Sequence, residues 1–292
     1  MIEIPVKNHV LFSLLPELKF WRKQIFIIVS PPIMSKFAQL NTGIMINTIF
    51  QHRSIRKFKS DPVPQELLDR ILEAGSRAST TGNMQVYSMI VTRKESIRKQ
   101  LWESHFKQDM VLQAPVHITF CADFNRFNKW CGMRKAEPGY DNFLSFFTAS
   151  IDALLASQNV VLEAESRGLG ICYLGTATYM ADSITEILGL PEAVVPVAAI
   201  VLGYPDEDPQ LTERLPMRAI VHEEKYQEYS DQEIDEIYAL REASELTAEL
   251  LEENQKKTLA QVFTDNRYTK KDNIHFSKQF LELIKKQGFF NQ

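Results

Sequence analysis

Residues 150–167 are the stretch that most constrains the fold, because their pattern is helical but leaves little polar surface. The stretch closes on Arg167 and Gly168, a basic last turn followed by a glycine cap. A helix that is apolar on most sides has to be covered by protein on most sides. The pattern therefore predicts a central buried helix, with apolar positions at Ile151, Leu154, Leu155, Val161, Leu162 and Ala164.

A chain of 292 residues is long enough to bury such a helix in a large core without staples. Length alone favours two domains, although one α/β or α+β unit of this size is allowed. The 33 Lys and Arg against 37 Asp and Glu give a net charge of −4. A mildly acidic balance argues against nucleic acid or an anionic membrane as the main partner.

Shorter elements surround the central helix in the pattern. Apolar and β-branched runs predict strands at residues 87–92, 117–121, 171–174 and 195–202, and the last, unbroken run is typical of a central strand. Helical periodicity predicts helices at 64–77, 95–106 and 182–188. Beyond Pro216, residues 230–257 are Glu-rich and helical in pattern, and residues 276–287 form an amphipathic helix. Arms of this kind usually wrap a neighbour or a partner subunit.

The cysteines and histidines exclude two classes of site. Cys121, Cys131 and Cys172 form no C-x-x-C pair, and their odd number in a long chain argues against a disulfide framework. A reduced, cytoplasmic setting fits best. The histidines show no metal-binding spacing, so no metal site is expected.

The first 44 residues are an extension of uncertain status. Residues 10–34 are apolar in patches, but lysines and an arginine interrupt them. The stretch is therefore a poor signal peptide, and its uninterrupted apolar run is too short to cross a membrane. Three interpretations stay open: an arm packed on the body, a membrane-surface helix, or translated sequence upstream of a natural start at Met34 or Met45. We favour the first and third over the membrane.

The first motif that could carry chemistry is His52-Arg53-Ser54-Ile55-Arg56. Alternation in an extended segment places Ser54 and Arg56 on one face, where a hydroxyl and a guanidinium fork could bind a phosphate. The alternative is a solvated basic surface, because Lys57 and Lys59 continue the run.

The second motif is the polar stretch 78–85, between a predicted helix and a predicted strand. Its hydroxyls and carboxamides, among them Thr80, Asn83 and Gln85, suit the edge of a flat heterocycle with donors and acceptors. An ordinary connecting loop is the alternative.

Two further motifs follow later in the chain. Gly168-Leu169-Gly170 precedes a strand rather than following one, so it fails as a dinucleotide-binding fingerprint. The loop after the 195–202 strand carries Arg214 between prolines, where it could reach a ligand or merely decorate the surface.

Taken together in order and spacing, these motifs resemble the nitroreductase family, in particular its larger NADPH-dependent nitroreductase and flavin reductase group. The resemblance runs from about residue 46 to the C-terminus. It implies an α+β homodimer with a mostly antiparallel central sheet flanked by helices. FMN would bind non-covalently at the subunit interface of a core at residues 45–216. A helical C-terminal excursion, residues 217–292, would wrap the partner subunit.

The resemblance also assigns roles to single residues. The basic motif would grip the FMN phosphate and ribityl chain, the polar loop and Gln108 would touch the flavin, and the segment after the 171–174 strand would lie along the isoalloxazine ring. The implied cofactor residues are His52, Arg53, Ser54, Arg56, Thr80, Asn83, Gln85, Gln108, Tyr173, Leu174, Gly175, Thr176 and Arg214.

The sequence departs from the family pattern at three positions. Thr212 stands where the family has a Lys, which removes a positive charge near the flavin. Thr176 replaces a second Gly and is expected to narrow the approach to the ring. Asn83 resembles the smaller nitroreductases. These departures bear on the flavin potential and substrate preference, not on the choice of cofactor.

The implied chemistry is flavin-mediated, so no side chain need act as nucleophile or general base. Hydride would pass from NADPH or NADH through flavin N5 to a nitroaromatic, quinone or flavin acceptor in a ping-pong cycle. Candidates for the NADPH 2′-phosphate are Arg267, Lys270 and Lys271, with a solvated charge cluster as the alternative. The alternative function is a non-catalytic or differently specialised flavin-binding dimer of the same fold.

Overall fold

The computed structural model describes residues 47–291, and residues 51–292 form one compact unit. The predicted N-terminal extension, residues 1–44, lies outside the described residues. Within the described part, every strand predicted from the sequence is present.

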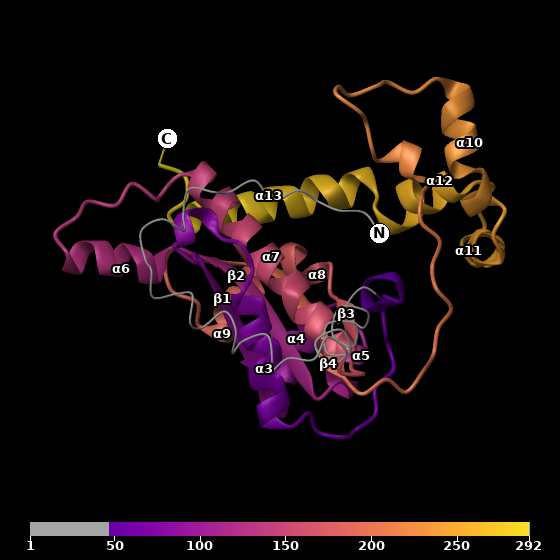
Figure 1. Ribbon diagram of the computed structural model, residues 1–292. Coiled ribbons are helices and arrows are strands. Elements are labelled where there is room, and N and C mark those ends of the chain that lie inside the picture. Colours follow the sequence, from indigo (N-terminus) through magenta and orange to yellow (C-terminus); the bar gives the residue numbers. More distant parts are fainter. Residues whose placement is uncertain (1–46, 292) are drawn as a thin grey trace, which may run out of the picture. The chain divides into compact units, whose positions relative to one another are not determined.

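The sheet has four strands in the order β1-β2-β4-β3, and every neighbouring pair is antiparallel. This is the α+β architecture with an antiparallel sheet that the sequence predicted (Figure 1). As its unbroken apolar run predicted, β4 lies inside the sheet, hydrogen-bonded on both sides. The strands are β1 (Tyr87–Thr92), β2 (Val116–Asp123), β3 (Gly170–Tyr173) and β4 (Val194–Gly203).

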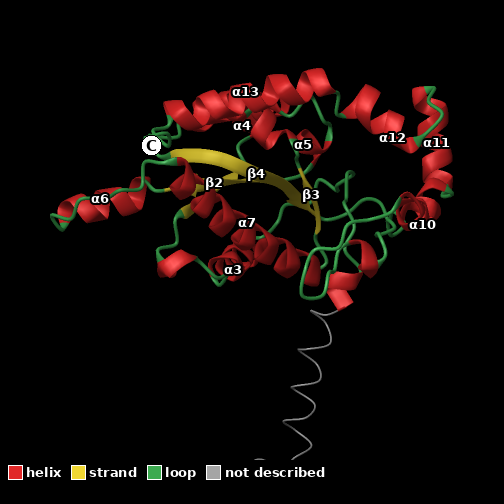
Figure 2. Cartoon of the chain, turned by 90° about the horizontal axis from the view of Figure 1, so that it is seen from above, coloured by secondary structure: helices red, strands yellow, loops and turns green. Residues whose placement is uncertain are grey.

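The two faces of the sheet are covered by different helices. The long helix α7 (Phe143–Ser166) contacts all four strands on one face, and α3 (Gln65–Ser76) packs beside it. The opposite face carries α4 (Glu95–Ser104), α8 (Thr176–Tyr179) and α9 (Ala181–Leu188). Figure 2 shows α7 and α3 on one side of the sheet and α4, α5 and α13 on the other.

Strand alternation assigns the side chains of β2 to these two faces. Ile118 and Phe120 belong to the core under α7 and α3, so His117 and Thr119 point to the opposite face. That face also holds a smaller apolar cluster built around Ile55, Cys172 and Leu174. Two polar side chains of β2 are therefore buried beneath α4 and α8.

The remaining helices connect and extend this body. They are α5 (Met110–Gln113), α6 (Asn125–Met133), α10 (Asp231–Glu242), α11 (Glu245–Asn254), α12 (Leu259–Gln261) and α13 (Lys270–Lys286), with a π-helical turn at Val262–Arg267 and 3₁₀ turns at Thr81–Asn83 and Met217–Ala219.

The central helix differs from its prediction in length and in burial. It begins at Phe143, seven residues before the predicted start, because the Asn142 side chain caps it by accepting the Ser145 N–H at 3.1 Å. One face is buried as predicted, but a stripe of five apolar side chains is 43–72% exposed: Leu144, Phe147, Ile151, Leu154 and Leu155. The part of this chain that the structure describes leaves that stripe uncovered.

The last helix returns to the body instead of standing apart. α13 begins at Lys270, six residues before the predicted start, because Thr269 caps it through the Asp272 N–H. It packs against α8 and α9, and Leu283, Ile284 and Phe289 enter a core with Phe146. The end of the predicted excursion thus belongs to the same compact unit as the sheet.

Candidate functional site

Residues 173–176, the β3–α8 segment, join the edge strand to a short helix. The Tyr173 hydroxyl lies 2.8 Å from the Ser157 hydroxyl of α7, and the Leu174 N–H donates to the Ala199 carbonyl of β4 at 2.9 Å. Leu174 is buried, whereas Tyr173 and Gly175 are exposed. The segment therefore offers backbone and one aromatic ring to the surface from a fixed position.

Gly175 has no reason within the described chain to be glycine. Its φ of −61° suits any residue, and a Cβ placed there would meet no atom within 4 Å. At Gly170, five residues earlier, the same Cβ would lie 2.6 Å from Ile55. A flat ligand lying against the backbone does account for a glycine at 175, because only glycine lets such a group approach closely.

Residues 52–56, the basic segment, run alongside β3. Ser54 forms a parallel bridge with Ile171, and the Ile55 N–H donates to the Ile171 carbonyl at 2.8 Å. The His52 Nδ1 lies 2.7 Å from Glu165 Oε1 at the end of α7. Burial raises the pKa of Glu165, while the facing imidazole opposes that rise. This pairing fixes the His52 ring beside the exposed edge of the sheet.

The three arginines predicted to hold a cofactor differ in their freedom. Arg53 donates to Pro209 O at 2.9 Å and pairs with Asp208. Arg214 donates to the Thr212 hydroxyl, in its own loop, at 2.6 Å. Within residues 47–291, the Arg56 guanidinium has no hydrogen-bond or ion-pair partner. It lies near the Cys172 thiol, whose pKa burial raises and whose rise Arg56 partly offsets. Of the three arginines, Arg56 is thus the one most available to an anionic ligand.

The polar loop around Thr80, Asn83 and Gln85 is held by a side chain that the sequence analysis missed. Asp152, buried in α7, accepts the Thr81 N–H at 3.0 Å. Asn83 and Gln85 are exposed and both adopt φ of +55°, a left-handed conformation uncommon outside glycine. A carboxylate on the inner face of an apolar helix was the available signal, because such a group needs a buried partner.

Thr176, the first residue of α8, points inward. Its Oγ1 lies 2.7 Å from Nδ1 of the buried His105, and the Gln108 amide donates toward the same oxygen at 3.5 Å. The side chain is only 9% exposed. The structure gives no support to the expectation that Thr176 narrows the approach to a ring, because this side chain points into the interior.

Comparison with known proteins bears on these features. Residues 49–204, more than half of the chain, match the family model described as the nitroreductase family. This chain belongs to the nitroreductase family. A Vibrio harveyi NADPH-flavin oxidoreductase is 33% identical over 68% of this chain and 85% of its own length. An oxygen-insensitive NADPH nitroreductase from Salmonella typhimurium is 35% identical over 62% of this chain and 74% of its own.

Solved structures agree with that assignment. A Bacteroides fragilis protein classed provisionally as an oxidoreductase superposes with a TM-score of 0.83 and 47% identity, over 84% of this chain and all of its own. The NADPH:FMN oxidoreductase of Vibrio harveyi, solved with NAD⁺, gives a TM-score of 0.73 and 28% identity over 85% and 100%. The antiparallel sheet and its helical layers are thus those of the nitroreductase family.

In this nitroreductase-family protein, side chains of α7 hold several separate parts of the predicted site in place. Asp152 holds the polar loop, Ser157 holds Tyr173, and Glu165 holds His52, so three successive parts of one helix support three predicted contacts. Gln108 joins the same corner through Thr176. Arg214 is not brought together with them, since its side-chain hydrogen bonds stay within residues 212–213.

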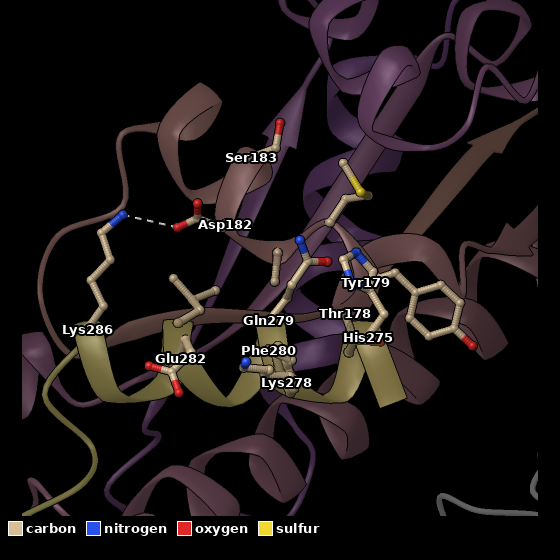
Figure 3. A pocket seen from close by; sticks show the side chains of 13 residues that line it. Thr178, Tyr179, Asp182, Ser183, His275, Lys278, Gln279, Phe280, Glu282 and Lys286 are labelled. Atoms are coloured by element: carbon tan, nitrogen blue, oxygen red, sulfur yellow. Dashed lines mark hydrogen bonds and ion pairs between the residues drawn. The ribbon is translucent and has the colours of Figure 1, made fainter. Parts of the chain in front are cut away.

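Two cavities are lined by residues of both α8 and α13. One, of about 580 Å³, separates α8 and α9 from α13, and Lys286 pairs with Asp182 across it at 3.1 Å (Figure 3). The other, of about 290 Å³, contains Arg267. Lys270 and Lys271 do not line it. The three cations predicted to bind the NADPH 2′-phosphate are therefore not equivalent.

Proposed function

We propose that this protein is an FMN-dependent oxidoreductase that takes hydride from NADPH or NADH and passes it to electron-poor acceptors such as nitroaromatics, quinones or free flavin. Family membership supports the reaction class. The observation that carries the cofactor proposal is Gly175, an exposed glycine that neither conformation nor packing explains. Bound FMN would accept hydride from the nucleotide and donate it to the second substrate.

The residues around Gly175 fit FMN. Arg56 supplies an unpaired guanidinium for the phosphate, and Ser54 lies on the same extended segment beside β3. Tyr173 and the exposed backbone at Gly175 form the surface against which a flat ring would lie. Gln108 and the polar loop add donors and acceptors at its edges. Their task is to bind and orient, which leaves the redox chemistry to the cofactor.

The decisive experiment is to purify the protein, identify any released flavin, and reduce the holoprotein anaerobically with NADPH and NADH in parallel. We expect bound FMN, bleaching by at least one nucleotide, and reoxidation by a nitroaromatic or a quinone. A colourless protein that cannot take up FMN would overturn the proposal. FMN that binds but is not reduced by either nucleotide would favour the non-catalytic alternative.

We further propose that the exposed stripe of α7 is the core of a homodimer interface. Leu144, Phe147, Ile151 and Leu154 recur at helical spacing on the face turned away from the sheet. A continuous apolar face of this kind marks an association surface. The C-terminal arm supports the same proposal, since Leu240 of α10 is 81% exposed. The two features together favour a partner subunit wrapped by α10 and α11.

Light scattering tests the dimer. Phe147→Glu places a charge in the centre of the stripe and is expected to give a monomer, whereas Lys99→Glu, on the exposed side of α4, should leave the dimer intact. A wild-type protein that runs as a monomer at micromolar concentration would contradict the proposal. If the Phe147→Glu variant loses FMN when it loses the ability to dimerise, the cofactor lies near the interface.

For the nucleotide, we propose that the smaller cavity receives the adenosine end. The cavity is lined by Tyr179, the last residue of α8, and by Phe106, just beyond the end of α4. Tyr179 stacks on Phe276 with ring centroids 4.7 Å apart, and Arg267 lines the same space. Arg267→Ala should raise the KM for NADPH more than that for NADH, while Lys271→Ala should change neither. Equal effects of the two substitutions would contradict the assignment.

A further inference from the structure

Four buried polar side chains form a continuous chain from the sheet to the β3–α8 segment. His117 Nε2 lies 3.0 Å from His105 Nε2, and His105 Nδ1 lies 2.7 Å from Thr176 Oγ1. At the other end, the Thr119 hydroxyl lies 3.5 Å from His117 Nδ1. Both histidines and Thr119 are fully buried. The chain therefore connects the interior of β2 with the first residue of α8.

Both imidazoles are neutral near pH 7. Burial lowers the pKa of His105 to about 4. Burial, together with the positive charges of His105 and Arg98, lowers that of His117 to about 3. Two neutral rings that meet through their Nε2 atoms can place only one proton between them. The two histidines must therefore be opposite tautomers, one protonated on Nε2 and the other on Nδ1.

Only two arrangements of protons satisfy every contact in the chain. In one, Thr176 donates to His105, His105 donates to His117, and His117 donates to Thr119. In the other, each of these bonds is reversed, and the Thr176 hydroxyl proton becomes free to point elsewhere. The direction of the hydrogen bond at Thr119 therefore fixes the direction of the hydrogen bond at Thr176, because the two histidine rings connect them.

We propose that His105 and His117 are positioning residues that hold the Thr176 hydroxyl, and through it the Gly175–Thr176 turn and the Gln108 amide, in the arrangement that binds the flavin. The inference rests on the proposed function, because it takes the β3–α8 segment to be where the flavin lies. It also accounts for the threonine that this chain carries at position 176. A glycine there would leave His105 Nδ1 buried without a partner, which is costly.

A nearby pair provides the matched control. The Ser104 and Ser183 hydroxyls lie 2.8 Å apart, and Ser104 is buried next to His105 in the sequence. Removing Ser104 Oγ therefore breaks a half-buried hydrogen bond at the same helix end without touching Thr176. If the histidine chain only stabilises the fold, removing the Thr176 hydroxyl should affect FMN binding no more than removing the Ser104 hydroxyl does.

The test compares Thr176→Val, which keeps the shape and removes the hydroxyl, with Ser104→Ala in the full-length holoprotein. FMN affinity is measured by flavin fluorescence and the midpoint potential by redox titration. We expect Thr176→Val to weaken FMN binding by about tenfold, the factor that one or two ordinary hydrogen bonds supply. If one redox state loses more than the other, the potential moves by about 30 mV for each tenfold difference. Ser104→Ala should change the FMN affinity by less than about twofold and the midpoint potential by less than about 10 mV.

His105→Asn and His105→Leu keep the proposal testable if Thr176→Val folds poorly. The Asn carboxamide takes the place of the Nδ1 side of the ring and retains a partner for Thr176, whereas Leu retains none. We expect Asn to recover most of the FMN affinity that Leu loses. In the wild type, ¹⁵N spectra of labelled histidine should show one neutral ring of each tautomer, and FMN should shift both.

Three results would overturn the proposal. These are equal FMN affinity and potential in Thr176→Val and Ser104→Ala, no recovery by Asn, or two buried histidines of the same tautomer. A wild-type protein that binds no FMN overturns the proposed function as well. Normal FMN binding with no difference between the variants overturns only the positioning role.

Discussion

The two ends of the proposed flavin site are built in opposite ways. The β3–α8 segment rests on buried partners: Ser157 under Tyr173, and His105 under Thr176. The backbone of the basic segment is likewise tied to β3, through the Ile55 N–H, but its arginines are held at the surface, where Arg53 pairs with an Asp208 side chain that is 91% exposed. Exposed ion pairs contribute little to the stability of the fold, because water competes for both charges. The first end is therefore fixed before a ligand arrives, whereas at the second the arginine side chains can rearrange around a phosphate.

The largest expected effect concerns the buried support. Since the pKa values of His105 and His117 are lowered to about 4 and about 3 in the folded protein, the unfolded chain binds protons there first. Stability present above pH 6.5 should therefore be lost as the pH falls. Between pH 7 and pH 5, the free energy of unfolding should drop by about 3 to 4 kcal/mol from these two groups.

Urea unfolding at a series of pH values measures this loss. His117→Gln removes one of the two titrating groups and should reduce the slope by about half. A free energy of unfolding that does not change between pH 7 and pH 5 would show that the histidine pair is not held neutral. The proposed difference between the two ends of the site would then be wrong.

The next prediction compares the effects of replacing Gly170 and Gly175 by alanine. Gly170→Ala places a methyl group 2.6 Å from Ile55 and should destabilise the apoprotein by about 1–3 kcal/mol. Gly175→Ala meets nothing within 4 Å, so the apoprotein should keep its stability while FMN binds more weakly. Thermal unfolding with and without FMN separates the two. Unchanged FMN affinity in Gly175→Ala would remove the main argument for the cofactor.

Arg56→Ala tests the adaptable end. Loss of a charge-assisted bond to phosphate should weaken FMN binding by about 10- to 100-fold. Lys57→Ala removes a neighbouring positive charge outside the predicted motif and should change the affinity by less than about threefold. Retention of FMN by the Arg56 variant refutes the phosphate assignment.

The smallest effect is expected at Asp208. Asp208→Asn frees Arg53 from an exposed pair, so stability should change by less than about 1 kcal/mol. FMN affinity should stay the same or rise slightly, because another guanidinium becomes available. A tenfold loss would mean that the surface pair is as important to the site as the buried contacts are.

Local patterns in the sequence were enough to predict the four strands and most of the longer helices, but not α5, α6 or α8. β1 occupies the predicted residues, and the unbroken run 195–202 lies inside β4, an interior strand as predicted. Helix starts were less accurate, because caps such as Asn142 and Thr269 act through one side chain and alter no periodicity. The exposed stripe of α7 was also missed, since an apolar residue reads the same whether its own chain or a partner would cover it.

The site was harder to predict than the fold. Family resemblance named Thr176 and Gln108, but nothing in the spacing connects position 105 with 117 or 176, which meet only after the sheet has formed. Asp152 was missed for the same reason, because its role depends on where a loop seventy-one residues away returns. Whether each named residue contacts a flavin stays a prediction that the substitutions above address.

One consequence of the fold concerns its synthesis. The core that contains Val86 and Phe146 also takes in Phe289, which is fully buried. Because the chain emerges from its N-terminal end, this core cannot close until α13 has left the ribosome and folded back. Until then, the surface that α13 covers and the apolar stripe of α7 stay open together, a state prone to aggregation. Growing cells should therefore need chaperones for this protein during translation, and truncation within α13 should send it to proteases rather than yield a smaller enzyme.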